Sequence, residues 1–369
     1  MFKIKNIETY IIQVPLLVPL KMSGVHIEHC DNTVVKITAN NGKFGWGEAP
    51  YAPFFNGETS RGMVAAIDFM KDRLLGKEIL QQSDIKDVIS STIYGNSGAK
   101  SAIDMALYDL FGKSEDKPLY ETLGGAKRDK VPMIWLVAGG DNEFKLLAEK
   151  VDQGFVSFKV KVGTNKVQED IERSYQAQRI LDHNYTLSAD ANQGFNRSDA
   201  LIFASKTGDI GLDFFEQPVT GKDIDTMVEC NARSYAPIGV DEGIHNIDDI
   251  KIHYDRKAAN GGSLKMIKFG GVAQLFEAAN LMHSYDMHIN LAGKAANTSI
   301  GSAAIAHFTR ALPSLDWDAS LSSQYLSDDI AENPVKVIEG HIITPDDGPG
   351  LGINIDEDKL NQYLSLIHI

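Results

Sequence analysis

Cysteine is scarce in this chain of 369 residues, which contains only Cys30 and Cys230. Two cysteines so far apart do not suggest a disulfide framework or a zinc module, so we interpret them as reduced thiols. No apolar run is long enough to span a bilayer. The opening residues MFKIKNIETYIIQV alternate like a strand and lack the features of a signal peptide. The sequence therefore predicts a cytoplasmic protein without a membrane partner.

Positive charge is in deficit, with 36 Lys and Arg against 50 Asp and Glu and a formal net charge of -14. Such a surface does not attract phosphate backbones or acidic lipids, which argues against nucleic-acid binding. A glycine-rich GxGxxG or Walker sequence is also missing, so an open doubly wound nucleotide-binding sheet is disfavoured. We expect a small-molecule partner.

Eight short apolar runs recur from Val131 onward, and most are separated by amphipathic stretches of helical length such as 166–181 and 273–285. The runs are PMIWLVA, FVSFKVKV, YTLSADAN, GLDFFEQP, PIGVDE, SLKMIKF, MHINLAG and SLDWDAS. Strands that alternate with helices form parallel sheets through right-handed crossovers. Eight such units predict an α/β protein with a (β/α)8 barrel, whose site lies at the carboxyl ends of the strands.

The residues before the barrel pattern have a different organisation. Strand-like segments at 2–14, 32–39 and GWGEAP precede the helical pattern GNSGAKSAIDMALYDLFGK, which predicts an α+β unit. We expect an N-terminal capping domain over residues 1–126, the barrel over 127–334, and a C-terminal segment, 335–369, that packs back on the capping domain. The segments 22–31 and 51–60 are the candidate lids over the barrel mouth.

Five charged residues each end an apolar run, at intervals of about one strand plus one helix: Lys161, Asp190, Glu216, Asp241 and Lys265. In a barrel these positions converge at one edge. Three carboxylates in a confined site repel one another unless a cation neutralises them. All three are hard oxygen donors without Cys or His, which favours Mg²⁺, or Mn²⁺, over zinc.

The lysines suggest acid/base chemistry. Lys159 and Lys161 are two apart on one predicted strand, so they share a face and each is expected to lower the pKa of the other. Lys265 and Lys268 form a looser pair. A lysine with a lowered pKa can remove the proton beside a carboxylate while a metal stabilises the enediolate. The same lysines could instead be ion-pair partners of the acids.

The chain resembles the enolase superfamily, specifically its muconate lactonizing enzyme subgroup, which is also grouped with mandelate racemase. The resemblance rests on an ordered set of motifs: GWGEAP, GNSGAKSAIDMALYDLFGK, KVKVG, ADANQG, EQP, DEG, LKMIKFGGV and PGLGI. A lysine base with Mg²⁺ is a known arrangement of such sites, so the chemistry is matched here to that pattern. The resemblance also implies a homo-oligomer, a dimer or octamer.

The resemblance implies roles for individual residues. Asp190, Glu216 and Asp241 would bind Mg²⁺, and Lys161 and Lys265 would act as acid and base on opposite faces of the substrate. The resemblance and the neighbouring sequence suggest supporting or substrate contacts for four more residues: Lys159, Asn192, Glu242 and Lys268.

The expected reaction is proton abstraction from a small carboxylate, leading to racemisation or epimerisation of an amino-acid derivative or dipeptide. Asp316 and Asp318 in SLDWDAS resemble the aspartate pair with which dipeptide epimerases hold a substrate ammonium group. The seventh run, however, continues as NLAGKAANTSIGS, which departs from the epimerase pattern and adds Lys294. Muconate-type cycloisomerisation and dehydration of a hydroxy acid are the alternatives. A Schiff-base aldolase and a noncatalytic binding protein are more distant ones.

Overall fold

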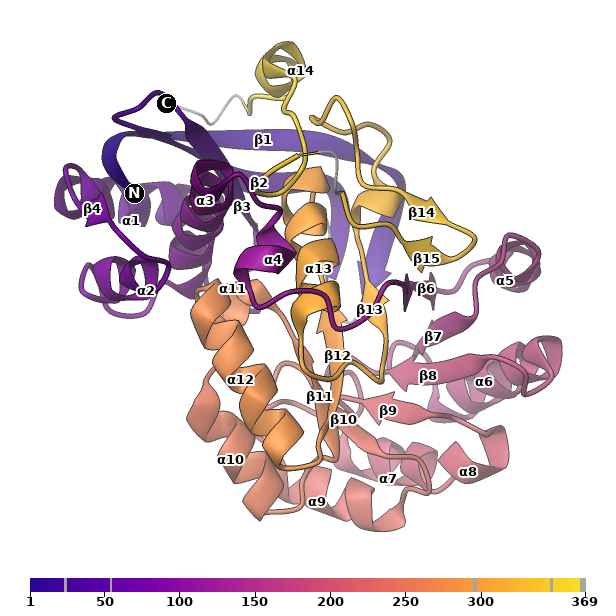
Figure 1. Cartoon of the computed structure of the whole chain (residues 1–369). Coiled ribbons are helices and arrows are strands. Elements are labelled where there is room, and N and C mark those ends of the chain that lie inside the picture. Colours follow the sequence, from indigo (N-terminus) through magenta and orange to yellow (C-terminus); the bar gives the residue numbers. More distant parts are fainter. Residues whose placement is uncertain (23–24, 54, 295–296, 346–347, 366–369) are drawn as a thin grey trace.

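The computed structural model describes residues 1–22, 25–53, 55–294, 297–345 and 348–365, apart from the side chains of residues 18–27 and 30. It consists of an N-terminal antiparallel sheet with helices, and a barrel of parallel strands surrounded by helices (Figure 1). In the described residues, no helix is both long enough and apolar enough to cross a membrane.

The capping domain is built on a four-stranded sheet with the order β3-β2-β1-β4. Its strands are β1 (Phe2–Met22), β2 (Val25–Ala39), β3 (Phe44–Pro50) and β4 (Glu78–Ile79). Its helices are α1 (Ser60–Leu74), α2 (Ser83–Ser90), α3 (Ser97–Glu115) and α4 (Leu119–Thr122). The predicted strands are present, but β1 and β2 stay paired beyond Val14, with Pro15 opposite His29. The first predicted lid, 22–31, is therefore largely hairpin strand.

Two glycines explain why α3 lies so close to this sheet. A Cβ on Gly45 would come within 2.1 Å of the Ala106 carbonyl oxygen, and one on Gly47 within 2.1 Å of the Ala102 carbonyl oxygen. Only glycine tolerates such an approach of strand to helix backbone. The helix is consequently buried around most of its circumference.

A strand lies at each of the eight predicted runs, in the unbroken sheet order β13-β12-β11-β10-β9-β8-β7-β6. The sixth run, SLKMIKF, is strand only at its first two residues, and its last four form the short helix α11 (Met266–Phe269). The strands are β6 (Ile134–Val137), β7 (Ser157–Lys161), β8 (Thr186–Asp190), β9 (Phe214–Glu216), β10 (Ile238–Val240), β11 (Gly261–Leu264), β12 (His288–Ala292) and β13 (Ala319–Ser320). A parallel bridge between Met133 and Ala319 closes the sheet. The predicted (β/α)8 barrel is confirmed.

Helices connect the barrel strands and cover their outer faces (Figure 1). They are α5 (Glu143–Asp152), α6 (Val167–Leu181), α7 (Arg197–Ala204), α8 (Thr207–Ile210), α9 (Ile224–Arg233), α10 (Ile247–Asp255), α11 (Met266–Phe269), α12 (Val272–Ser284) and α13 (Ser299–Ala311). The expected helices at 166–181 and 273–285 correspond to α6 and α12. Alternation of strand and helix thus identified the barrel correctly.

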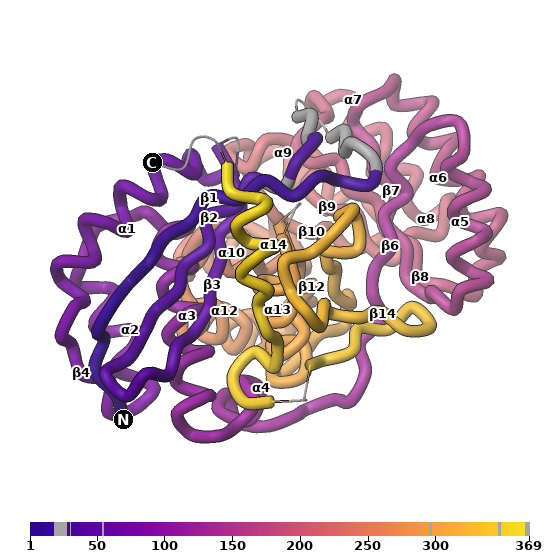
Figure 2. Tube along the Cα trace, turned by 90° about the horizontal axis from the view of Figure 1, so that it is seen from above, coloured from indigo at the N-terminus to yellow at the C-terminus, as the bar shows by residue number. Residues whose placement is uncertain are grey.

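The C-terminal segment returns to the capping domain. Strands β14 (Val337–Ile338) and β15 (His341–Ile342) first form a small sheet with β5 (Val131–Pro132). The chain then runs past α13 to α14 (Glu357–Gln362), beside the long strands of the capping sheet (Figure 2). There the Gln13 amide donates to the Tyr363 carbonyl, and Lys36 pairs with Glu357 at 2.5 Å. The tail therefore completes the capping domain.

Two buried acids of the capping domain join it to the barrel. Asp104 of α3 accepts a 2.7 Å hydrogen bond from the Val272 amide at the first residue of α12. Glu48 of β3 accepts hydrogen bonds from the Asn297 and Thr298 side chains and from the Gly301 amide, around the start of α13. The first amides of a helix lack partners within the helix, and the carboxyl oxygens of these two residues accept hydrogen bonds from them. Each acid thus holds the start of a barrel helix from the other domain.

Asp104 makes stability depend on pH. Burial raises its pKa to about 7, above the value of about 3.9 in an unfolded chain. A raised pKa gives stability that is complete below the unfolded pKa and is lost as pH rises through the folded one. From about pH 5 to pH 8, the wild type should therefore lose roughly 2 to 3 kcal/mol that Asp104→Asn does not lose.

Urea unfolding across this pH range measures the effect. Asp152→Asn, at an exposed position on α5, is the control and should follow the wild type. Parallel pH profiles for wild type and Asp104→Asn would show that Asp104 is not the titrating group.

Candidate active site

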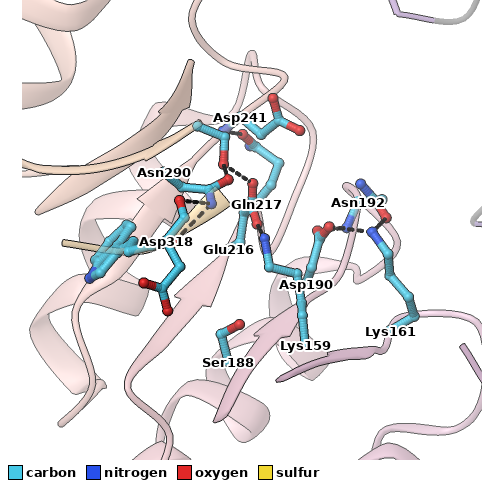
Figure 3. Close-up of polar contacts among 12 residues, drawn as sticks. Lys159, Lys161, Ser188, Asp190, Asn192, Glu216, Gln217, Asp241, Asn290 and Asp318 are labelled. Atoms are coloured by element: carbon cyan, nitrogen blue, oxygen red, sulfur yellow. Dashed lines mark hydrogen bonds and ion pairs between the residues drawn. The ribbon is translucent and has the colours of Figure 1, made fainter. Parts of the chain in front are cut away.

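The strand ends bring the five predicted charged residues to the carboxyl edge of the barrel. β7 ends at Lys161, β8 at Asp190 and β9 at Glu216. Asp241 and Lys265 directly follow the last residues of β10 and β11. Parallel strands share one carboxyl edge, and Figure 3 shows the side chains of four of these residues, together with Lys159, near one another. This edge is the candidate site.

Each carboxylate of the trio contacts a lysine. Lys161 Nζ lies 2.5 Å from Asp190 Oδ2, and Lys159 Nζ pairs with Glu216 Oε2 deeper in the barrel. Asp241 pairs with Lys265 through Oδ2 and with the fully buried Lys268 through Oδ1, the latter at 2.9 Å. The ion pairs that the sequence left open as an alternative are thus formed. Charge compensation holds the acids in this low-dielectric region.

The lysine pKa expectation is wrong for Lys265. Burial lowers its pKa, but the charge of Asp241, with smaller contributions from Glu242 and Glu216, outweighs burial and raises the pKa above the ordinary range. Burial likewise raises the pKa of Asp241, but Lys265 and Lys268 outweigh it and hold that pKa well below its usual value. For Lys268, burial dominates and lowers the pKa. An adjacent acid therefore has more influence on Lys265 than the neighbouring lysine has.

A fourth carboxylate, Glu242, lies beside this group. Asn192 connects it to the site, donating to Glu242 Oε1 at 3.1 Å while its own Oδ1 accepts from Lys161 at 2.8 Å. Glu242 Oε2 has no hydrogen-bond partner among the described residues. Burial, followed by the charges of Asp241 and Asp190, raises the pKa of Glu242 to about 8. Burial is thus the main cause of the raised pKa, and the two neighbouring acids add to it.

This donor set fits a hard divalent cation. Asp190, Glu216 and Asp241 offer carboxylate oxygens from three successive strands, the ligand type that Mg²⁺ and Mn²⁺ prefer. Glu242, whose Oε2 has no hydrogen-bond partner among the described residues, lies beside these acids. Within the described ranges, no three acidic, His or Cys side chains are already arranged to hold a metal. A cation would have to compete with the lysines for these oxygens.

The second predicted lid reaches the site. The Phe55 ring lies 4.9 Å from Lys265 Nζ and 5.8 Å from Lys294 Nζ, measured to the ring centroid. Glu58 fixes this segment by accepting from the Gly98 and Ala99 amides at 2.8 and 3.1 Å, near the start of α3. The sequence marked the segment but did not single out Phe55, although an aromatic residue in a predicted lid was an available signal.

Asp316 and Asp318 do not join the site. β13 begins at Ala319, so both acids precede the strand. Asp316 pairs with His288 Nδ1 and accepts from the Ile289 amide at 3.0 Å, at the start of β12. Figure 3 shows the Asp318 carboxylate turned away from Glu216. The expectation that this pair holds a substrate ammonium group is corrected, because both side chains lie toward the opposite edge of the barrel.

The reason for the error lies in Trp317, between the two acids. Trp317 stacks on Phe214 at 4.1 Å and on His288 at 5.0 Å, and is buried. Trp317 thus fills the lower barrel and holds Asp316 and Asp318 at that level. The alternating pattern predicts that the two acids lie on the same face of a strand. It does not predict how far along the barrel axis they lie.

Three polar residues that support the acids were missed from the sequence. Gln217 Oε1 accepts from the Asp241 and Gly243 amides at 2.8 and 3.1 Å. Ser263 Oγ contacts Glu216 and lies 2.9 Å from Asn290 Oδ1. All three side chains are buried or nearly so. Polar residues inside apolar strand runs were the available signal, since an inward position in a barrel strand normally carries a branched apolar side chain.

Comparison with known families agrees with this geometry. The family model described as Enolase C-terminal domain-like matches residues 143–359. The model described as Mandelate racemase / muconate lactonizing enzyme, N-terminal domain, matches residues 6–124. The chain therefore belongs to the mandelate racemase/muconate lactonizing enzyme family of the enolase superfamily.

Individual relatives cover nearly the whole chain. The N-succinyl-L-Arg/Lys racemase of Bacillus cereus is 29% identical over 369 residues, covering 98% of this chain and 97% of that protein. The L-Ala-D/L-Glu epimerase of Bacillus subtilis (strain 168) is 31% identical over 359 residues, covering 95% and 96%. The crystal structure of muconate lactonizing enzyme from Pseudomonas fluorescens complexed with muconolactone matches with a TM-score of 0.93 and 28% identity, covering 99% and 100%. The protein is an enzyme of this divalent-metal-dependent family.

The Lys159–Glu216 pair yields a stability prediction. Lys159→Met leaves the Glu216 carboxylate buried without its cation, which should cost about 3 to 5 kcal/mol of unfolding free energy. Urea denaturation in EDTA measures it. Lys145→Met, at a side chain that is 75% exposed, removes the same charge and should change stability by no more than about 0.5 kcal/mol. Equal losses in both variants would contradict a stabilising pair.

Proposed function

We propose that the protein racemises or epimerises a small carboxylate, most specifically an amino-acid derivative, by removing and returning the proton beside its carboxyl group. One observation carries the proposal: β7 and β11 stand four places apart in a closed sheet of eight strands. Lys161 and Lys265 at their carboxyl ends therefore face each other across the barrel mouth. A planar substrate between them presents one face to each lysine.

The two lysines exchange roles in this proposal. One takes the proton from its face, and the other delivers a proton to the opposite face, which inverts the centre. Asn192 orients Lys161 through its 2.8 Å hydrogen bond. Lys268 holds the chain at Asp241 by donating to that residue's carbonyl at 2.8 Å and to the Ser263 carbonyl at 2.6 Å. Both contacts reduce the positional freedom of the reacting groups.

Asp190, Glu216 and Asp241 are the proposed ligands of Mg²⁺, with Mn²⁺ as a substitute. Bound there, the cation would supply positive charge for the substrate carboxylate, on which negative charge grows as the proton leaves. Lys159 balances Glu216 from within the barrel and is proposed to add positive charge near that carboxylate. The Phe55 lid covers the Lys265 side and restricts water there.

The relatives support this reaction class, since one is named a racemase and another an epimerase. Muconate-type cycloisomerisation is the second candidate, supported by the similarity to muconate lactonizing enzyme. Two opposed lysines can serve either reaction, so the lysine pair does not choose between the two candidates. A homo-oligomeric assembly remains a prediction.

Replacement of either lysine tests the two-base proposal. Lys161→Ala and Lys265→Ala should each lower turnover at least about a thousandfold, because each removes one proton carrier. Each variant should still exchange deuterium from D₂O into the enantiomer whose proton faces the remaining lysine. NMR of both enantiomers of N-acyl amino acids and dipeptides measures this. Wild-type turnover in either variant would exclude the assignment, whereas cycloisomerisation of a muconate without α-exchange of any amino-acid derivative would favour the second candidate.

Metal removal provides a separate test. Exchange should stop in EDTA and return with Mg²⁺. Without the cation at the three acids, no positive charge there stabilises the reacting carboxylate of the substrate. Glu216→Gln should weaken the recovery, while Glu149→Gln, a partly exposed acid on α5, should not. Full exchange in EDTA would instead point to metal-independent lysine chemistry, which borohydride trapping of a Schiff base would detect.

A further inference from the structure

Glu242 is a buried acid at the barrel mouth to which the proposed proton transfers give no part. It directly follows Asp241, in the loop after β10. Its carbonyl oxygen accepts a hydrogen bond from His245 Nε2 at 3.1 Å, and the next amide, that of Gly243, donates to Gln217 Oε1 at 3.1 Å. The backbone around Glu242 is therefore fixed, and its side chain has a defined starting point.

The Glu242 side chain reaches Asn192, in the loop after β8. Asn192 Nδ2 donates to Glu242 Oε1 at 3.1 Å. On its other side, Asn192 Oδ1 accepts from Lys161 Nζ at 2.8 Å (Figure 3). The Asn192 amide nitrogen donates to Asp190 Oδ1 at 2.8 Å, so this residue is held at its backbone as well. Asn192 thus connects the loop after β10 to the lysine that ends β7.

The orientation of the Asn192 side-chain amide follows from its two neighbours. A carboxylate only accepts hydrogen bonds and an ammonium group only donates them. Glu242 therefore fixes the Nδ2 end of the amide, which leaves the Oδ1 end for Lys161. With the amide reversed, two donors would meet at Lys161 and two acceptors at Glu242. The acceptor that Asn192 presents to Lys161 depends on the acceptor that Glu242 presents to Asn192.

Lys161 Nζ has two side-chain partners among the described residues, Asp190 Oδ2 at 2.5 Å and Asn192 Oδ1 at 2.8 Å. Asp190 is also a proposed metal ligand, whereas Asn192 is not. The Asn192 contact is therefore the one of the two that serves Lys161 alone. A fixed acceptor of this kind restricts the positions of a proton carrier, which favours a productive approach to the substrate.

The charge of Glu242 acts elsewhere in the site. Burial has the largest influence on the pKa of three lysines and lowers it, and the charge of Glu242 is a smaller influence that opposes burial at each of them: Lys265, Lys268 and Lys294. The hydrogen bond to Asn192 and the charge of Glu242 thus act on different groups. A variant that keeps the acceptor and removes the charge separates the two effects.

We propose that Glu242 is a positioning residue that acts through the Asn192 amide to hold Lys161 against its face of the substrate. The inference rests on the proposed function, because it assigns Glu242 to one of the two opposed proton carriers. Loss of the Glu242 acceptor slows proton transfer on the Lys161 face and not on the Lys265 face.

Glu242→Gln and Glu242→Met are the matched variants. Both remove the charge and nearly keep the length of the side chain, but only glutamine keeps an oxygen acceptor for Asn192. NMR measures deuterium exchange from D₂O, with Mg²⁺, into both enantiomers of the N-acetyl derivatives of alanine, lysine, glutamate and phenylalanine. The enantiomer that Lys265→Ala still exchanges is the one whose proton faces Lys161. On that enantiomer Glu242→Met should exchange about tenfold more slowly than Glu242→Gln, and on the other the two should agree within about twofold.

A second substitution tests whether Glu242 acts through Asn192. In an Asn192→Ala background, glutamine and methionine at position 242 should give equal exchange on the Lys161 face, because the connecting amide is absent. A difference of about tenfold that persists in this background would show that Glu242 acts directly, and it overturns the inference. Equal rates for the two single variants on the Lys161 face, or equal slowing on both faces, also overturn it. Glu149→Met, on α5, is the control and should leave both rates unchanged.

Crystal structures of the two Glu242 variants test the positioning without turnover. Glu242→Gln should keep Lys161 Nζ within hydrogen-bond distance of Asn192 Oδ1, whereas Glu242→Met should lose that contact. An unchanged contact in Glu242→Met overturns the inference. Failure of the proposed function looks different, because the wild type would then exchange no α-proton of any probe, and the two structures would still decide whether Glu242 positions Lys161.

Discussion

Compensation of buried carboxylates by lysines is the interaction on which the site depends. Asp190, Glu216 and Asp241 stand at successive strand ends where water is largely excluded, and isolated charges there would be very costly. Lysines from β7 and from the segment after β11 meet them from two sides. These paired carboxylates and lysines stabilise the folded barrel. They are also the groups that a cation and a substrate carboxylate would contact. Stability and the proposed chemistry therefore share one set of side chains.

Acidic side chains that bind the starts of helices join distant parts of the chain. Glu58 in the lid holds the start of α3, Asp104 in α3 holds the start of α12, and Glu48 in β3 holds the start of α13. Each contact satisfies amides that the helix itself leaves free. Together they connect the Phe55 lid, the capping domain and the barrel. The position of the lid over Lys265 thus follows from interactions well outside the barrel mouth.

A cavity beside Lys294 lies at the junction of the two domains. Its lining combines residues of β3 and α3 with residues that follow β11 and β12. The acids and lysines of the candidate site lie at the strand ends, whereas the shape of this cavity depends on how the capping domain sits on α13. Family membership therefore accounts for the shared fold and reaction class.

The sequence by itself determined the barrel, its eight strands and the convergence of Lys161, Asp190, Glu216, Asp241 and Lys265, because alternating strands and helices force strand ends to one edge. Tertiary structure decided the rest. Trp317 packs into the lower barrel and carries Asp316 and Asp318 away from the site, a height that alternation does not encode. The pKa of Lys265 follows its contact with Asp241, and the positions of Phe55 and Gln217 depend on contacts between remote segments. Periodicity reports which face a residue occupies, but only packing sets what that face meets.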